Sequence, residues 1–351
     1  MSGGDKLKVA VLTESRSDYG VYYPLLKALQ ADERFELQLL VTGMHLSKAH
    51  GYTINEIENS FNIAFWRTRP KRVLIQSDIL LILGDRRPML EAAIDAAYQN
   101  IPVAHIQGGD VTETIDESCR HAITRFAHLH FPALNESADR LLKMGEEPWR
   151  ITVVGPLGIY AMPDAEFIPR ERLLRDLRLE DKPIILVIQH PVSGREPFAG
   201  EQMKDTLTAV HNPDWQPIVI YPNNDLGSKG MIDVIEHHPF AKFKNLPYLQ
   251  FISLLKESAV IVGNSSCGIV EAPFFGVPVV NIGNRQKGRK YASGIININY
   301  GDNIRGAIDY ALSKGLTRTM VKASTEGVEK ILEVLGRLEI NERLLQKRIT
   351  Y

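Results

Sequence analysis

The sequence predicts an α/β protein made of two Rossmann-like domains, each built on an open parallel sheet. Short apolar runs alternate with helical stretches along the chain, which is the pattern of βαβ units. The alternation breaks once near the middle and then resumes as a second series of strands and helices. A length of 351 residues also exceeds that of one ordinary domain. Together these observations favour two α/β units.

Strands of the first unit are expected at runs rich in Val, Ile and Leu. The first of these runs leads into a helix, because Tyr22, Leu25, Leu26 and Leu29 recur at helical spacing. The last two predicted strands are shorter and less apolar than the others. The predicted strands of this half are 7–12, 35–41, 78–83, 103–106, 130–132 and 151–154.

The pattern breaks at the Gly-Pro-Leu-Gly of 155–158 and the proline-bearing stretch that follows, so we expect a hinge within 155–169. We therefore expect an N-terminal domain over 1–160, a C-terminal domain over 161–330, and a terminal helical segment over 331–351 that packs back on the first domain. One long amphipathic helix is expected over 321–345. Strands of the second unit are predicted at 184–188, 217–220, 260–262 and 277–281.

Composition narrows the class of ligand and the compartment. The 41 Lys and Arg nearly balance the 42 Asp and Glu, so bulk charge attracts neither nucleic acid nor an anionic membrane. The two cysteines, Cys119 and Cys267, have no metal-ligand spacing, which is typical of a reduced intracellular protein. No signal-peptide pattern and no membrane-spanning apolar run occur. We expect a soluble cytoplasmic protein without nucleic-acid or membrane partners.

Loops that follow the predicted strands are the candidate sites, because ligands of open parallel sheets bind beyond the carboxyl ends of strands. The loop after the first strand, Thr-Glu-Ser-Arg-Ser-Asp-Tyr-Gly over 13–20, lacks the G-x-G-x-x-G pattern and so disfavours NAD. Its Arg16 could reach an anion above the helix N-terminus. Alternatively, a Ser or Asp of this loop caps the helix beside a solvated arginine. The loop alone leaves both interpretations open.

Acidic and basic side chains gather after the third and fourth strongly apolar strands. Residues 84–87 read Gly-Asp-Arg-Arg, residues 105–110 read His-Ile-Gln-Gly-Gly-Asp, and acids, Arg and His follow within 116–121. Carboxylates in one pocket can act as general acid and base when their environments separate their pKa values. Asp116 could instead be a helix N-cap with Glu117 complementing the helix dipole. Capping and catalysis are compatible.

The second half contains the sharpest candidate site. His190 ends one strand, and the next ends at Tyr-Pro-Asn-Asn-Asp over 221–225. Residues 262–271 then read Val-Gly-Asn-Ser-Ser-Cys-Gly-Ile-Val-Glu, so a strand runs into small residues that open a helix. Successive N–H groups and two hydroxyls there suit a diphosphate, and Glu271 suits a ribose diol. A basic glycine loop over 283–289 supplies cations for the same phosphates.

At these residues the chain resembles the UDP-N-acetylglucosamine 2-epimerase family over nearly its whole length. The Arg-x-Asp-Tyr form of the first loop resembles the hydrolysing branch, which includes the epimerase half of the animal sialic-acid enzyme. The non-hydrolysing bacterial branch carries a Thr-Arg-Pro-Glu type of loop there. The stretches that carry the resemblance, in the family's order, are 16–20, 83–86, 105–110, 114–121, 189–192, 263–268 and 284–289.

The resemblance implies a glycosyltransferase-B-like arrangement in which two domains clamp a UDP-sugar. It implies removal of the proton at sugar C2 while the anomeric bond to UDP breaks, which gives a 2-acetamidoglucal. Water then adds, and N-acetylmannosamine and UDP leave, as in sialic or legionaminic acid biosynthesis. The resemblance implies no metal or redox cofactor. We expect a homodimer or homotetramer.

Site residues follow from the resemblance and the motifs. The candidates for catalysis are Asp85, Gln107, Asp116, Arg120 and His190. Some relatives have Glu where this chain has Gln107, and others have His, so the acid–base work is expected to pass to Asp85, Asp116 or Asp110. The interval between His45 and Asp85 is roughly one helix shorter than the family pattern. The candidates for substrate or nucleotide binding are Arg16, Ser17, Gly20, Arg86, Asn223, Phe251, Ser265, Ser266, Glu271 and Arg285.

Three other functions remain open at the level of sequence, because a fold does not determine a function. A non-hydrolysing epimerase would return UDP-N-acetylmannosamine. A binding or regulatory protein would keep the nucleotide site without catalysis, and a glycosyltransferase would need an acceptor site. The sequence also leaves open N-acetylglucosamine or a 2,4-diacetamido sugar, and UDP or GDP.

Overall fold

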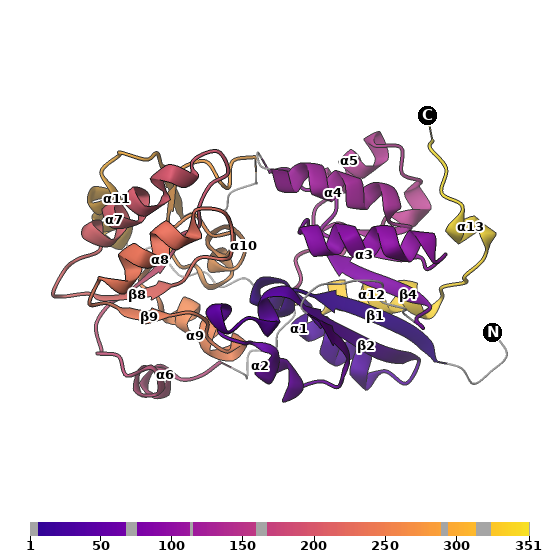
Figure 1. Ribbon diagram of the computed structural model, residues 1–351, viewed down its shortest axis with the longest axis horizontal. Coiled ribbons are helices and arrows are strands. Elements are labelled where there is room, and N and C mark those ends of the chain that lie inside the picture. Colours follow the sequence, from indigo (N-terminus) through magenta and orange to yellow (C-terminus); the bar gives the residue numbers. More distant parts are fainter. Residues whose placement is uncertain are drawn as a thin grey trace.

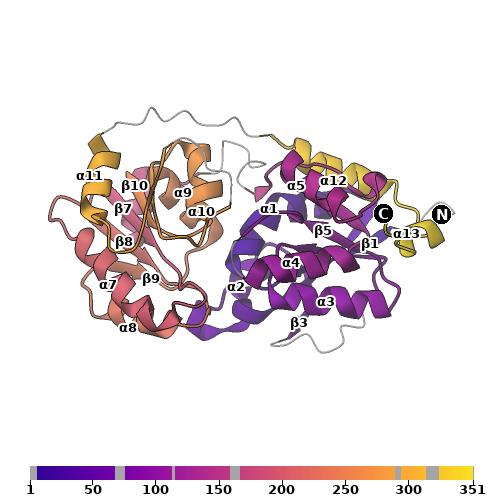
Figure 2. The same cartoon turned by 90° about the horizontal axis from the view of Figure 1, so that it is seen from above.

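The protein has two lobes, each a six-stranded sheet with helices on both faces (Figures 1 and 2). This computed structural model describes residues 6–67, 76–112, 115–158, 167–288, 294–313 and 324–350. The sheet order is β3-β2-β1-β4-β5-β6 in the first lobe and β12-β11-β10-β7-β8-β9 in the second. All neighbouring strands pair in parallel. Counted from its own first strand, the second lobe repeats the order of the first, which is the Rossmann order. The predicted fold class is confirmed.

Helices of the first lobe cover both faces of its sheet. One core cluster lies against α1 and α2, and another lies against α3 and α4 on the opposite face. The central strand β4 is buried at every position, because both of its faces are covered. The strands are β1 (Leu7–Thr13), β2 (Phe35–Thr42), β3 (Ile63–Arg67), β4 (Ile79–Leu83), β5 (Val103–Ile106) and β6 (Leu129–Phe131). The helices are α1 (Arg16–Ala31), η1 (Gly43–Leu46), η2 (Lys48–His50), α2 (Ile54–Glu58), α3 (Arg87–Tyr98), α4 (Ile115–Phe126), α5 (Asn135–Lys143) and η3 (Pro148–Arg150).

Helices of the second lobe also cover both faces of its sheet. The first face of its sheet packs against α6, α9, α10 and η7, and the second packs against α7, α8 and α11. The strands are β7 (Ile184–Ile188), β8 (Gln216–Ile220), β9 (Ala241–Phe243), β10 (Val260–Gly263), β11 (Val279–Ile282) and β12 (Ile295–Ile298). The helices are α6 (Arg170–Leu177), η6 (Glu196–Phe198), α7 (Ala199–Ala209), α8 (Ser228–Glu236), α9 (Tyr248–Glu257), α10 (Cys267–Val270), η7 (Ala272–Phe275) and α11 (Ile304–Ser313).

The C-terminal helices α12 (Glu326–Gly336) and α13 (Glu342–Leu345) lie beside the first lobe, yellow in Figures 1 and 2. Side chains of both helices belong to the core cluster that also contains α1. The buried Arg150 donates hydrogen bonds to the carbonyls of Arg343 and Leu344 and so holds α13. The prediction of one long helix over 321–345 is wrong. Helix α12 ends at Gly336, and a separate helix, α13, begins at Glu342. The Asn341 side chain caps α13 by accepting a hydrogen bond from the Leu344 N–H. Residues 321–323 lie outside the described part.

The strands that the sequence missed are β3, β9 and β12, which lie at the edges of the two sheets. Edge strands are covered less completely, and β9 and β12 are half-buried or exposed along their length. They therefore lack the continuous apolar run of a central strand. The strand predicted over 151–154 is wrong, since Ile151 makes only an isolated bridge to His130. Residues 159–166 of the predicted hinge, and residues 68–75 of the short interval before Asp85, lie outside the described residues.

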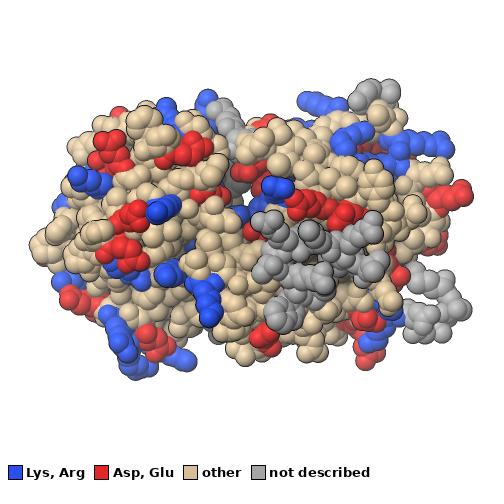
Figure 3. All heavy atoms as spheres, in the orientation of Figure 1, with Lys and Arg blue, Asp and Glu red and all other residues tan. Residues whose placement is uncertain are grey.

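Charge is mixed over the molecular surface in view. Figure 3 shows basic and acidic side chains interspersed across both lobes. Within the described ranges, no helix combines the length and the hydropathy that a bilayer crossing requires. Nor does any group of three or more His, Cys, Asp or Glu in those ranges form a candidate metal site.

Candidate active site

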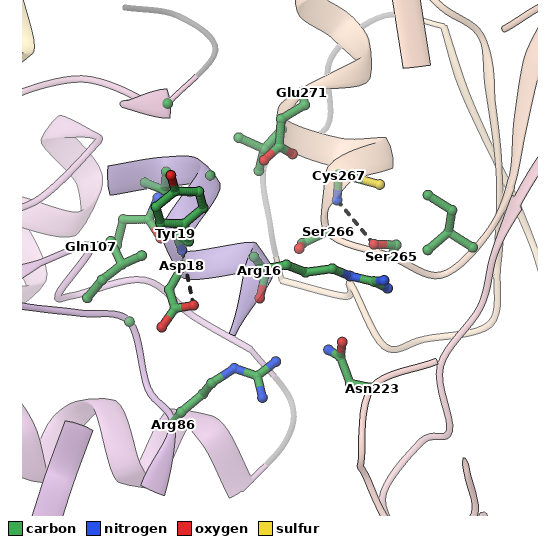
Figure 4. Close-up of a pocket in the computed structure, with 18 of the residues that line it drawn as sticks. Arg16, Asp18, Tyr19, Arg86, Gln107, Asn223, Ser265, Ser266, Cys267 and Glu271 are labelled. Atoms are coloured by element: carbon green, nitrogen blue, oxygen red, sulfur yellow. Dashed lines mark hydrogen bonds between the residues drawn. The ribbon is translucent and has the colours of Figure 1, made fainter. Parts of the chain in front are cut away.

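A cavity of about 260 Å³ lies between the lobes, at the carboxyl ends of both sheets. Strand order reverses between β1 and β4 in one sheet and between β7 and β10 in the other, which is where open α/β sheets bind ligands. All candidate residues for catalysis and binding line this cavity, and their roles stay predictions (Figure 4). The lining candidates are Arg16, Ser17, Gly20, Asp85, Arg86, Gln107, Asp116, Arg120, His190, Asn223, Phe251, Ser265, Ser266, Glu271 and Arg285.

The loop after β1 is organised by Asp18, which the sequence offered only as a possible cap and not as a site residue. Its carboxylate accepts hydrogen bonds from the Glu14 N–H at 2.8 Å and from the Ser15 N–H and hydroxyl at 2.7 Å each. Ser15 is the N-cap of α1, so the capping interpretation of this loop is right. The sequence pattern that predicts this cap is a Ser followed three residues later by an acid.

Arg16 is not a solvated side chain beside that cap. Its guanidinium crosses the cleft (Figure 4) and donates to the carbonyl of Lys244 at 2.6 Å and that of Tyr221 at 3.0 Å. Both carbonyls belong to the second lobe. Burial lowers the pKa of Arg16 to about 10, which still leaves it charged at neutral pH. Arg16 therefore places a positive charge at the junction of the lobes and links them.

Asp85 is held by a buried arginine. It follows Gly84, whose φ of +76° suits glycine, at the end of β4. Arg120, from α4 and only 1% exposed, forms an ion pair with the Asp85 carboxylate. Arg120 also donates to the Asp110 carbonyl at 2.8 Å. These bonds determine the orientation of the Asp85 carboxylate at the cavity wall.

Asp116 lies in the first turn of α4, four residues before Arg120 and so on the same side of the helix. Because α4 begins at Ile115, Asp116 is its second residue and the N-cap interpretation is wrong. Glu117 accepts a hydrogen bond from the Thr112 N–H at 2.8 Å. Residues 113 and 114 lie outside the described part of the chain.

Gln107 leaves β5 in the left-handed region, with φ of +61°. Its N–H donates to the Phe131 carbonyl at 3.0 Å, so the backbone stays attached to the neighbouring strand β6. Non-glycine residues seldom adopt this conformation. The turn of the backbone brings the Gln107 side chain to the cavity (Figure 4).

His190 is buried and neutral. Its Nδ1 accepts a hydrogen bond from the Asn223 N–H at 3.2 Å, so the ring proton resides on Nε2. Burial, together with the positive charges of Arg285, Arg16 and Arg86, lowers the pKa of His190 well below its usual value. His190 can therefore donate a hydrogen bond through Nε2 without carrying charge.

The loop after β10 requires glycine at its start. Gly263 has φ of +136°, and a Cβ there would lie 2.1 Å from the Ile188 carbonyl oxygen. Asn264 then accepts a hydrogen bond from the His190 N–H at 2.7 Å and donates to the His190 carbonyl at 2.8 Å. The loops after β7 and β10 are thus joined at the switch point of the second sheet. The helix opened by Ser266 is a single turn, α10.

Arg285 faces the same loop from the segment after β11. Its Nη1 donates to the Asn264 carbonyl at 3.3 Å, and its Nη2 lies 3.9 Å from an oxygen of Asp225. Arg285 is thus bound to the residue that precedes Ser265, and it lines the same cavity as Ser265 and Ser266. Arg289, the last cation of the predicted basic loop, lies outside the described residues.

Contacts between the lobes include residues that the sequence analysis missed. The Tyr248 N–H, at the start of α9, donates to Glu56 of the first lobe at 2.6 Å. The Tyr248 ring packs against Tyr23, with centroids 5.3 Å apart. A Cβ at Gly20 would lie 2.7 Å from this ring, so glycine there allows the lobes to approach. No local pattern predicts contacts of such sequence separation.

The fold and site define a two-lobed, glycosyltransferase-B-like protein with carboxylates and arginines facing one interdomain cavity. A family model described as UDP-N-acetylglucosamine 2-epimerase matches residues 72–336. A hydrolysing UDP-N,N'-diacetylbacillosamine 2-epimerase of Legionella pneumophila is 33% identical over 377 residues, covering 98% of this chain and 99% of the relative. The chain belongs to the UDP-N-acetylglucosamine 2-epimerase family of enzymes.

Further relatives and solved structures agree with that family. A UDP-N-acetylglucosamine 2-epimerase of Neisseria meningitidis is 30% identical over 332 residues, with 88% of each chain covered. The S. aureus MnaA–UDP structure matches with a TM-score of 0.73 at 17% identity, covering 94% of this chain and 96% of that one. The Neisseria meningitidis enzyme bound to UDP-GlcNAc matches with a TM-score of 0.62 at 18% identity, covering 98% and 96%. These two structures share the fold.

Proposed function

We propose that this enzyme is a hydrolysing UDP-N-acetylglucosamine 2-epimerase, which releases N-acetylmannosamine and UDP through a 2-acetamidoglucal. The observation that carries the proposal is one cavity with Asp85 and Asp116 on one lobe and Ser265, Ser266 and Arg285 on the other. Such a cavity can hold a sugar against acid–base groups and a diphosphate against hydrogen-bond donors. The hydrolysing 2-epimerase that spans 98% of this chain supports the hydrolysing type of reaction.

In this proposal the second lobe binds the nucleotide. The N–H groups and hydroxyls of Ser265 and Ser266 donate to the diphosphate, and Arg285 adds a positive charge. Because α10 is one turn long, its macrodipole contributes little, and the individual donors carry the binding. Glu271 accepts hydrogen bonds from the ribose hydroxyls. Phe251 offers an apolar face to the base.

The first lobe performs the proton transfers at the sugar. A carboxylate takes the C2 proton while the anomeric C–O bond breaks and its electrons leave with UDP. Water then adds to the 2-acetamidoglucal at the anomeric carbon, and C2 receives a proton on the opposite face. Asp85 and Asp116 are the candidate acid and base, and Arg120 orients Asp85. Nε2 of neutral His190, together with the surrounding arginines, stabilises the growing charge on the departing diphosphate.

Incubation with UDP-N-acetylglucosamine in heavy water tests the proposal. We expect free N-acetylmannosamine and UDP, formed irreversibly, with solvent deuterium at C2, because the C2 proton exchanges with solvent through the carboxylate. NMR of the reaction mixture measures the products and the label. Stable UDP-N-acetylmannosamine would instead identify a non-hydrolysing epimerase, and transfer to an added acceptor would identify a glycosyltransferase. Binding without any turnover would identify a binding protein.

A second substrate is supported by one specific observation. The relative that is 33% identical to this chain is named for UDP-N,N'-diacetylbacillosamine. The same heavy-water incubation with that UDP-sugar, followed side by side with UDP-N-acetylglucosamine, ranks the two by kcat/KM. The substrate with the higher value defines the sugar for which the cavity is selective.

Gln107 leads to a prediction about activity. We expect the natural protein to turn over its substrate despite Gln107, since a carboxamide can orient a hydroxyl or a water although it cannot take the C2 proton. Gln107→Glu should keep or raise kcat, because it restores the acid found in some relatives. Initial rates of UDP release measure both proteins, with Gln99→Glu at the end of α3 as the matched control. If only Gln107→Glu catalyses C2 exchange, the natural chain is a nucleotide-sugar binding protein.

A further inference from the structure

A buried carboxylate, Glu14, lies behind the cavity wall and has no part in the reaction described above. It follows β1, is 5% exposed, and packs beneath η1. A Cβ at Gly43, whose φ is +57°, would lie 2.5 Å from the Glu14 Cγ, so protein encloses this side chain closely. Oε2 of Glu14 has no hydrogen-bond partner among the described residues, and Nη1 of Arg86 lies 3.4 Å from it.

Arg86 connects Glu14 to the cavity. It is the N-cap residue of α3, and its side chain lines the cavity and points to its centre (Figure 4). Burial lowers the pKa of Arg86, but the charges of Glu14, Asp18, Asp225 and Asp85 act in the other direction and leave it raised. The one guanidinium of Arg86 therefore interacts electrostatically with several carboxylates. Any additional anion in the cavity would compete with them for the same charge.

The charged and titratable groups around Glu14 come from every element packed against it. They are Arg86 before α3, Asp18 on α1, His45 on η1 and Asp225 after β8. Burial lowers the pKa of His45 to about 4, so His45 is neutral here. Burial raises the pKa of Glu14 to about 7, Arg86 opposes this rise, and Asp18 and Asp225 add to it. Glu14 therefore changes charge near neutral pH.

We propose that Glu14 competes with the diphosphate of the nucleotide sugar for Arg86, and that Glu14 takes up part of a proton from solvent, one at most, as the diphosphate binds. This inference rests on the proposed nucleotide site. Asp225 lies 3.9 Å from Arg285, and its charge also acts on Arg86, so phosphate charge at Arg285 also reaches Arg86. That charge makes the potential at Glu14 more negative, and the neutral carboxylic acid is then favoured. The proton returns to solvent when UDP leaves. Glu14 is a positioning residue that acts through Arg86 and does not touch the substrate.

The proton uptake has a direction that can be measured. A group whose pKa rises on ligand binding makes binding weaker as the pH rises above the pKa of the free protein. For one proton the limit is about tenfold in affinity for each pH unit. UDP binding is therefore expected to weaken from about pH 7 upward, since Glu14 ionises near that pH in the free protein.

Calorimetric titration of UDP between about pH 7.5 and pH 8.5 tests the inference, because a terminal phosphate with a pKa of about 6 is then fully ionised. Repeating the titration in buffers of different ionisation enthalpy counts the protons. The natural protein should bind UDP up to about tenfold more weakly at the upper pH and take up a fraction of a proton. Glu14→Gln should lose both the uptake and the pH dependence. Glu91→Gln, which removes a surface carboxylate paired with Arg87 on α3, should behave like the natural protein.

Two results would overturn the inference while leaving the nucleotide site intact: UDP binding by the natural protein with no proton uptake, or equal uptake by Glu14→Gln. The first result decides the matter even if Glu14→Gln fails to fold, since it needs the natural protein alone. No UDP binding by the natural protein at any pH would contradict the proposed function itself, and the Glu14 inference with it.

Discussion

Asp85→Asn is expected to lower kcat by about 10²- to 10⁴-fold while leaving the dissociation constant of UDP within about twofold. Asparagine keeps the shape of the side chain and can still accept a hydrogen bond from Arg120, but it cannot take a proton. The proposed nucleotide contacts lie on the second lobe, so we expect the change to leave them intact. Steady-state rates of UDP release measure kcat, and calorimetry measures UDP binding.

Asp116→Asn is expected to have an effect of the same size, because the proposed reaction needs an acid and a base on the sugar. Asp139→Asn, on the exposed face of α5, is the matched control and should retain full activity. If either cavity variant keeps the natural kcat, that carboxylate is not a proton carrier, and Asp110 becomes the next candidate. If a variant incorporates deuterium at C2 without releasing product, it still carries out one of the two proton transfers and has lost the other.

Arg285→Ala is expected to weaken UDP binding by about tenfold or more and to lower kcat by about 10²-fold. The guanidinium is bonded to the Asn264 carbonyl, just before Ser265, and lines the same cavity as the proposed diphosphate site. The negative charge on that diphosphate grows as the anomeric bond breaks, so the lost interaction is stronger in the transition state than in the ground state. Calorimetry with UDP and steady-state kinetics measure the two effects on the same preparation.

Arg175→Ala, on the exposed face of α6 in the same lobe, is the charge-matched control for that measurement. It should bind UDP as tightly as the natural protein and retain its kcat. An Arg285→Ala protein with natural UDP affinity would show that the nucleotide lies in another loop. A change in UDP affinity with a natural kcat would instead mean that Arg285 contacts bound substrate and transition state equally.

The sequence by itself determined the fold class and the positions of the loops that carry chemistry. Buried parallel strands are continuous apolar runs, so β4, β5 and β7 were readable without any knowledge of their partners. Because carboxyl ends of parallel strands meet at one edge of a sheet, the residues after each run could be assigned to a common cavity. Asp85 and Ser265 were found in that way.

Only the tertiary structure decided what the cavity residues contact. The hydrogen bond from Arg16 to Lys244 spans 228 positions in the sequence, and the packing of Tyr248 on Tyr23 spans a similar interval. The left-handed turn at Gln107 depends on its attachment to β6. Glu14 has no sequence signal at all, because its altered pKa comes from enclosure beneath η1 and from three charges on separate elements. Burial and long-range electrostatics are properties of the folded assembly of elements, and no local pattern of residues encodes them.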